Sequence, residues 1–452
     1  MLRLRDTLTG RVSELTPRDA GVVGLYVCGP TVYGPPHTGH GRFALVYDVL
    51  RRYLEFEGLR VDHVSNVTDI DDKIIERAAS EGRDWRAVAQ ESEAEWWAAM
   101  DAMGLARPSA TPHATDYITP MIEFVGELLA RSAAYETGDG VYLDTSLVAD
   151  YGLLKHQTID SLRAGARVEV DEQKKSPVDF ALWKRSKSGE PTWEAPFGSG
   201  RPGWHTECVV MSLALLGENF DLHGGGEDLI FPHHENERAQ AVADGKRFAR
   251  RWMHNGLVRV GGEKMSKSLG NITKMADLLA RSDARAYRLL VLGSHYRQPV
   301  EVNERTLEDA TTTLQRVDSL ARRFADAPRD AAGDEAGAAR QRFRDAMDDD
   351  LDTARALGGL FSAMRRANAL ADAGDARAGG ALARAVLDLF AALGVAGVGG
   401  RRETDGEVQE LVRRRDAARL GRDYAAADRL RAEIERLGWV VEDTPAGTRV
   451  YR

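Results

Sequence analysis

Four side chains of this sequence have the chemistry to hold one metal ion. Cys28 follows an apolar run typical of a buried strand, and Cys208 lies in WHTECVVMSLALLG, which indicates a helix. His233 and Glu237 are four residues apart, so on a helix they share one face. Two thiolates, an imidazole and a carboxylate suit tetrahedral Zn²⁺. The alternative is that both cysteines are inert core residues, as buried thiols often are.

Two other groups of residues suit phosphate. His37 and His40 lie where a helical pattern opens near Gly39, after a loop rich in Gly and Pro. Free backbone N–H groups and the helix dipole favour an anion there. Lys264 and Lys267 lie in the glycine-flanked segment GGEKMSKSLGN. Either pair alone is compatible with loop histidines or solvated lysines, but together they predict a nucleotide site.

The elements that must position these residues alternate between strand and helix. The apolar run 22–28 indicates a strand, residues 41–57 a helix, RVDHVSNV a strand and the stretch from Asp72 a long helix. This order predicts an α/β fold with a doubly wound parallel sheet. The acidic run Asp69–Asp72 precedes a helix, so we expect it to cap that helix and not to bind a metal.

The alternation stops in the middle of the chain and returns later, which predicts an insertion. Helix-like residues, short strand-like pieces (GVYLDT, ARVEV) and a polar segment fill the interruption. After Gly203 the strand and helix signals resume, and beyond Asp283 the apolar spacing is helical. The predicted parts are a sheet domain in two halves (1–115 and 201–310), an insertion (116–200), a helical bundle (311–396) and a small C-terminal α+β domain (403–452).

Composition limits the class of protein. The chain has 452 residues, 43% of them hydrophobic, which is ordinary for a globular protein with buried cores. Two cysteines argue against a disulfide framework, and neither a secretory signal nor an apolar run of membrane-spanning length is visible, so we expect a cytoplasmic protein without a membrane partner. The net charge of −9 does not exclude nucleic acid, because local clusters of Lys and Arg decide that.

The motifs resemble a known family. HTGH (37–40) and KMSKS (264–268) are similar to the two signatures of class I aminoacyl-tRNA synthetases. YVCGPTVY, NVTDIDDKI, RPGWHTEC and FPHHENERAQ, with the ending EDTPAGTR, extend the resemblance to cysteinyl-tRNA synthetases over essentially the whole chain. The resemblance implies a Rossmann-like catalytic domain that activates L-cysteine with ATP and Mg²⁺, releases pyrophosphate, and transfers cysteine to the 3′ end of tRNA(Cys). His37, His40, Lys264 and Lys267 would be its catalytic residues, acting on the ATP phosphates.

The resemblance also implies one zinc ion per chain, held by Cys28, Cys208, His233 and Glu237. An ordinary pocket favours cysteine over serine by only about a hundred-fold. A zinc ion that takes the substrate sulfur as a ligand distinguishes the two by their chemistry, because it binds the soft sulfur much better than a hydroxyl. No editing domain is then needed, in agreement with the modest insertion. The resemblance further implies a cysteine and adenylate pocket in which Asp228 faces the substrate ammonium; its residues are Gly29, Thr31, Thr68, Trp204, His223, Asp228 and Lys267. The other interpretations are that Trp204 is a core residue and that His223 caps a turn.

Within this resemblance, the helical bundle contacts the tRNA stem and the C-terminal domain reads the anticodon. We expect a monomer with no obligate protein partner. Three alternatives remain: an ATP-dependent ligase that joins cysteine to a glucosaminyl-inositol sugar, a non-catalytic tRNA-binding relative, and a structural zinc protein. The sugar ligases lack the C-terminal domain, and non-catalytic relatives usually have a broken signature motif.

Overall fold

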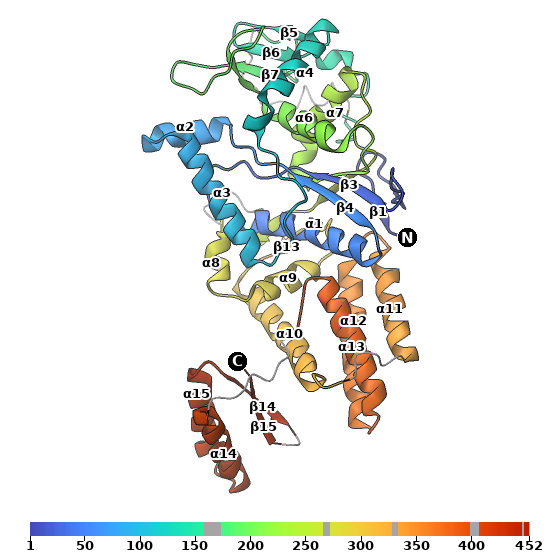
Figure 1. Ribbon diagram of the computed structural model, residues 1–452, viewed down its shortest axis with the longest axis vertical. Coiled ribbons are helices and arrows are strands. Elements are labelled where there is room, and N and C mark those ends of the chain that lie inside the picture. The colour runs from blue at the N-terminus through green and yellow to red at the C-terminus, as the bar shows by residue number, and fades with distance from the viewer. Residues whose placement is uncertain (158–172, 265–271, 328–332, 398–405, 445–446, 452) are drawn as a thin grey trace.

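A four-stranded parallel sheet lies at the centre of the molecule (Figure 1). The computed structural model describes residues 1–452 except 158–172, 265–271, 328–332, 398–405, 445–446 and 452. The strand order is β10-β9-β3-β4, with every pair parallel. The two inner strands are almost wholly buried, because both faces of a parallel sheet are covered. The strands are β3 (Val22–Val27), β4 (Arg60–Ser65), β9 (Leu222–Gly226) and β10 (Trp252–Asn255).

Helices connect and cover these strands. The predicted strand at 22–28 ends one residue earlier than expected, and the predicted first helix begins at Thr38 and leads from β3 to β4. Asp71 caps the next helix, with its carboxylate accepting from the Lys73 N–H, as the acidic run predicts. The helices are α1 (Thr38–Phe56), α2 (Asp72–Glu81), α3 (Trp85–Ala102), α6 (Trp204–Leu216) and α7 (Glu235–Ala243). The α/β fold class is therefore confirmed.

A separate antiparallel sheet, in the order β5-β6-β7-β8, lies in the segment between the two halves of the central sheet. Asp72 of α2 forms ion pairs with Lys184 and Arg201 of this sheet. The strand expected at ARVEV (166–170) lies outside the described residues. The elements are α4 (Ile118–Ala130), β5 (Ala134–Glu136), β6 (Gly140–Leu143), β7 (Phe180–Arg185) and β8 (Gly200–Pro202).

Two buried arginines join the later part of the chain to α1. Arg42 of α1 donates to the carbonyl oxygens of Leu257 and Tyr296, and Arg288 of α9 pairs with Asp48 of α1 at 2.6 Å. These contacts hold α1 against a small sheet and the first helices beyond it. The elements are β11 (Val258–Val260), β12 (Glu263–Lys264), β13 (Val300–Glu301), α8 (Met275–Leu279) and α9 (Ala284–Leu292).

Helices make up most of the remaining chain. Four pack as a bundle below the central sheet: α10 (Glu304–Arg323), α11 (Asp334–Met347), α12 (Thr353–Asp372) and α13 (Ala376–Ala392). Two helices and a hairpin follow, as predicted: α14 (Gly406–Leu420), α15 (Tyr424–Arg436), β14 (Val440–Thr444) and β15 (Gly447–Tyr451). At the N-terminus, β1 (Arg3–Arg5) pairs with β2 (Val12–Glu14). Among the described residues, no helix has the length and apolar character needed to cross a membrane.

Candidate functional site

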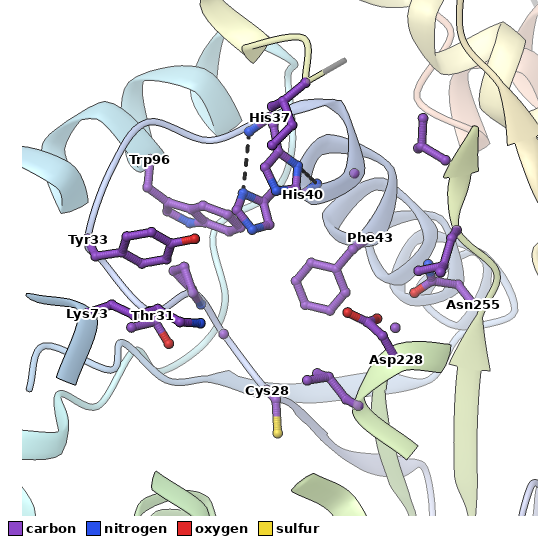
Figure 2. Close-up of a pocket in the computed structure, with 18 of the residues that line it drawn as sticks. Cys28, Thr31, Tyr33, His37, His40, Phe43, Lys73, Trp96, Asp228 and Asn255 are labelled. Carbon is purple, nitrogen blue, oxygen red and sulfur yellow. Dashed lines mark hydrogen bonds between the residues drawn. The ribbon is translucent and has the colours of Figure 1, made fainter. Parts of the chain in front are cut away.

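A cavity of about 340 Å³ opens where β3, β9 and β10 end and α1 begins (Figure 2). This position, outside the carboxyl ends of parallel strands, is where open α/β sheets bind ligands. Gly29, directly after β3, permits a close approach of two backbones, because a Cβ there would lie only 1.7 Å from the carbonyl oxygen of Asn66. The chain can therefore pass from β3 into the cavity wall only with glycine at this position.

His37 and His40 form one wall of the cavity at the N-terminus of α1. Their rings stack with centroids 3.7 Å apart, and the His40 backbone N–H donates to Nδ1 of His37 at 3.3 Å. Trp96 of α3 meets the His40 ring edge-on at 5.5 Å (Figure 2). The two imidazoles thus border the cavity at the positive end of a helix dipole, which suits an anionic ligand.

The four predicted metal ligands come together beside the cavity, which one of them, Cys28, lines. Cys28 Sγ lies 3.6 Å from Cys208 Sγ and 3.3 Å from Glu237 Oε1. His233 Nε2 lies 3.0 Å from the same carboxylate oxygen and 3.6 Å from Cys208 Sγ. All four side chains are buried. Figure 2 shows Cys28 with its sulfur pointing away from the two stacked histidines.

Burial controls the charge of this cluster. Desolvation raises the pKa of both thiols, that of Cys28 strongly, and lowers the pKa of the His233 imidazole well below its usual value. A divalent cation reverses this preference, because it stabilises thiolates directly. Two soft sulfur donors, one nitrogen and one oxygen within contact distance of one another fit Zn²⁺.

Further histidines surround the cluster. His223 Nε2 contacts the second oxygen of Glu237 at 2.8 Å, and His205 Nδ1 contacts His233 Nδ1 at 2.8 Å. These contacts orient the Glu237 and His233 side chains from behind, in the arrangement that outer partners of metal ligands have. His234 also points toward the cluster, with Nε2 3.9 Å from Glu237 Oε1, and it belongs to a compact group of donors with Cys28, His233 and Glu237. His234 was not among the predicted ligands, although its place beside His233 in PHHEN was a visible signal.

The residues expected in the cysteine and adenylate pocket divide into two groups. Gly29, Thr31, Trp204 and Asp228 line the cavity. Thr68 and His223 are buried and are not among the residues that line it. Trp204 at the start of α6 stacks on His233 with ring centroids 4.0 Å apart, so the cavity wall contacts the cluster of predicted metal ligands directly.

The lysine segment is only partly described. Lys264 ends β12, where its backbone pairs with Arg259 of β11, and Lys267 lies outside the described residues. Several other residues of the cavity wall were not predicted from the sequence, among them Tyr33, Lys73 and Trp96. Lys73 adds a cationic side chain to a cavity already suited to phosphate.

Comparisons with known proteins agree with this geometry. The family model described as "tRNA synthetases class I (C) catalytic domain" matches residues 14–312, and the DALR domain model matches residues 342–397. The chain has the fold of a methionyl-tRNA synthetase from Mycobacterium tuberculosis, with a TM-score of 0.64, 16% identity, and coverage of 82% of this chain and 91% of that one. It resembles LeuRS from Agrobacterium radiobacter K84 with a TM-score of 0.62, 11% identity, and coverage of 84% and 86%. Fold and site together define a class I aminoacyl-tRNA synthetase.

Relatives that match over nearly the whole of both chains identify the family within this class. A cysteine–tRNA ligase from Thermotoga maritima is 43% identical over 99% of both chains, and one from Halorhodospira halophila is 44% identical over 100% of both. A cysteine–tRNA ligase from Klebsiella pneumoniae is 44% identical over 99% of both chains. The chain belongs to the cysteine–tRNA ligase family.

Proposed function

We propose that this chain activates L-cysteine with ATP, releases pyrophosphate, and transfers the cysteinyl group to the 3′ end of tRNA(Cys). The observation that carries the proposal is the meeting of two chemistries in one cavity. A cluster of two thiols, an imidazole and a carboxylate adjoins the cavity through Cys28, and stacked histidines at a helix N-terminus form its wall. The first suits a metal that binds a substrate sulfur, and the second suits a triphosphate.

Cys28, Cys208, His233 and Glu237 would hold one zinc ion. When bound, zinc supplies a soft Lewis-acid position for the substrate sulfur that a serine hydroxyl fills far less well. Trp204, stacked over His233, covers this end of the cavity and limits the space beside the sulfur. Asp228 lines the same cavity and is our proposed partner for the substrate ammonium.

In the activation step, a carboxylate oxygen of cysteine attacks the α-phosphorus of ATP, and the bond to the leaving pyrophosphate breaks. This step needs positioning and fixed positive charge more than covalent help from the protein. We assign His37 and His40 to the phosphates, together with Lys264 and Lys267, and Mg²⁺ accompanies the nucleotide. The location of both imidazoles at the N-terminus of α1 supports this role.

In the second step, a ribose hydroxyl of the terminal nucleotide attacks the carbonyl carbon of cysteinyl-adenylate, and AMP leaves. We propose that residues 311–396 contact the tRNA stem and that residues 403–452 read the anticodon. The DALR match over 342–397 supports the first assignment, and the separate C-terminal unit in Figure 1 supports the second. The chain has only two cysteines, and we propose them as metal ligands and not as a disulfide, which favours a reducing compartment, the cytoplasm.

The relatives do not favour the sugar ligase. Relatives with the tRNA-ligase name match this chain over its whole length, the C-terminal unit included. Transfer of labelled cysteine to purified tRNA with ATP, with serine as the control amino acid, tests the proposal. We expect charging of one tRNA species with cysteine only. Cysteine-dependent pyrophosphate exchange without charging of tRNA would contradict it and support the sugar ligase.

A further inference from the structure

Lys73 is a cation of the cavity wall that has no anionic partner within the described part of the chain. It is the second residue of α2, it is exposed, and it lines the cavity. Its ammonium lies over the ring of Tyr33, 5.2 Å from the ring centre. A cation held over an aromatic face keeps a defined position and its full charge. Lys73 therefore offers a placed positive charge to whatever enters the cavity.

The two acidic residues beside Lys73 are engaged elsewhere. The Asp71 carboxylate accepts from the backbone N–H of Lys73 at 3.0 Å, as the cap of α2. Asp72 forms ion pairs with Lys184 at 2.5 Å and with Arg201. A lysine in the first turn of a helix also opposes the helix dipole. The ammonium of Lys73 thus does not stabilise α2, and an anion in the cavity would give it the partner that the protein does not supply.

The contacts around Lys73 hold it in place. Arg77 of α2 donates to the backbone carbonyl of Tyr33 at 3.0 Å, so the helix and the loop that carries the ring are joined. The ion pairs of Asp72 hold the start of the same helix against β7 and β8 of the insertion. A binding group that is fixed in advance loses little freedom when its ligand arrives.

The position of Lys73 in the cavity indicates which anion it meets. Figure 2 shows it at the opposite side of the cavity from Asn255, in a group with Thr31, Tyr33 and Trp96. Lys73 is exposed, whereas His37 and His40, which we assign to the phosphates of ATP, are half-buried. A ligand that enters from solvent therefore meets Lys73 at the mouth of the cavity. Cations combined with aromatic side chains are typical of sites for single-stranded nucleic acid.

We propose that Lys73 binds a backbone phosphate in the single-stranded 3′ end of tRNA. This inference rests on the proposed function, in which the terminal ribose must reach the adenylate inside the cavity. The strand that carries this ribose brings one phosphate for each nucleotide, and an exposed ammonium at the mouth neutralises one of them. Lys73 would thus guide the end of the RNA toward the reaction.

The test measures RNA binding and does not depend on catalysis. Two RNAs are used: a tRNA(Cys) transcript, and the same transcript without its three 3′-terminal nucleotides. Their dissociation constants are measured by fluorescence anisotropy at several salt concentrations with wild type, Lys73→Met and Lys73→Arg. Lys174→Met is the matched control, because the Lys174 ammonium also lies 5.2 Å from a tyrosine ring, that of Tyr142, and Lys174 is not among the residues that line the cavity.

We expect Lys73→Met to raise the Kd of the complete transcript about five- to tenfold and to reduce its salt dependence, the slope of log K against log salt, by about 0.7. The Kd of the shortened transcript should change less than about twofold, because the phosphate that Lys73 contacts is missing from it. Lys73→Arg should restore both the affinity and the slope. Lys174→Met should affect the two RNAs equally.

Two results would overturn the inference. If Lys73→Met weakens both transcripts equally, or neither, the lysine does not contact the 3′ end. If it slows cysteine-dependent pyrophosphate exchange and leaves the binding of both RNAs as in wild type, the lysine serves ATP instead. A wild-type protein that binds the transcript but does not charge it would contradict the proposed function, whereas the comparison of the two RNAs would still decide the role of Lys73.

Discussion

The sulfur atoms of Cys28 and Cys208 lie 3.6 Å apart, although 180 positions separate the two residues in the chain. Cys28 directly follows the central strand β3, and Cys208 lies on α6, which follows the insertion. No other predicted metal ligand lies close to either cysteine in the sequence. The site therefore forms only when the two halves of the sheet domain have assembled. The first prediction tests this shared site.

Cys208→Ser should lower cysteine-dependent pyrophosphate exchange by about 100-fold or more, because it replaces a soft sulfur ligand with a weakly binding hydroxyl. The protein should remain folded, since the two side chains have similar volumes. Zinc content, exchange rate and thermal melting are measured together. Ser212→Ala on the same helix is the control, because Ser212 is buried and bonds only the Val209 carbonyl among the contacts described. Exchange close to wild type in Cys208→Ser contradicts the proposed metal role.

Lys267→Ala should reduce the rate of adenylate formation by about 10²- to 10³-fold, because it removes a positive charge proposed to stabilise the leaving pyrophosphate. The KM for cysteine should change little, since the sulfur and ammonium contacts remain. Single-turnover adenylate formation measures the rate, and Lys155→Ala, an exposed lysine of the insertion, is the control. If the KM for cysteine rises sharply and the rate is retained, the proposed role of this lysine is wrong.

His63→Phe should reduce the loss of stability in acid. Burial lowers the pKa of His63 on β4 to about 3 from the usual 6.5, and neither ring nitrogen has a hydrogen-bond partner among the described residues. As the pH falls below 6.5, the unfolded chain takes up a proton that the folded chain does not accept until about pH 3. Stability that is present above pH 6.5 is therefore lost through this window.

Urea unfolding at pH 8 and pH 5 measures this effect. Removing the imidazole should reduce the difference between the two free energies of unfolding by about 2 kcal/mol. The exposed His156, replaced by Asn, is the control and should leave the difference unchanged. Other buried histidines, such as His205 and His254, also have pKa values lowered to about 3, so part of the acid sensitivity persists. An unchanged pH difference in His63→Phe would contradict the prediction.

Asp48→Asn should destabilise the protein by about 3–5 kcal/mol, because it leaves the buried Arg288 guanidinium without its charged partner. Urea unfolding measures the loss. Asp62→Asn is the matched control, since Asp62 pairs with Arg60 on the surface, where such pairs are worth at most about 1 kcal/mol. Similar losses in both variants would show that burial does not strengthen the Asp48 pair.

The elements that position the site could be predicted because their patterns are local. The apolar run of β3, the start of α1 near His37 and the four-residue spacing of His233 and Glu237 are each visible within one short segment. The distance between Cys28 and Cys208 depends on which strands pair, and no local pattern contains that information. Thr68, which the resemblance implies for the pocket, is buried and is not among the residues that line this cavity, so its place in the pocket stays a prediction.

The pairing of β3 with β9 also affects how the chain is synthesised. Leu25 pairs with Leu222, so the ribosome must add roughly 200 residues before the partner of β3 exists, which takes about 10–40 s at ordinary rates of translation. During that time one edge of a strongly apolar strand lacks its neighbour. A nascent chain of this protein therefore exposes an unpaired apolar strand edge for many seconds. The yield of folded protein in the cell should depend on chaperones that bind unfolded chains.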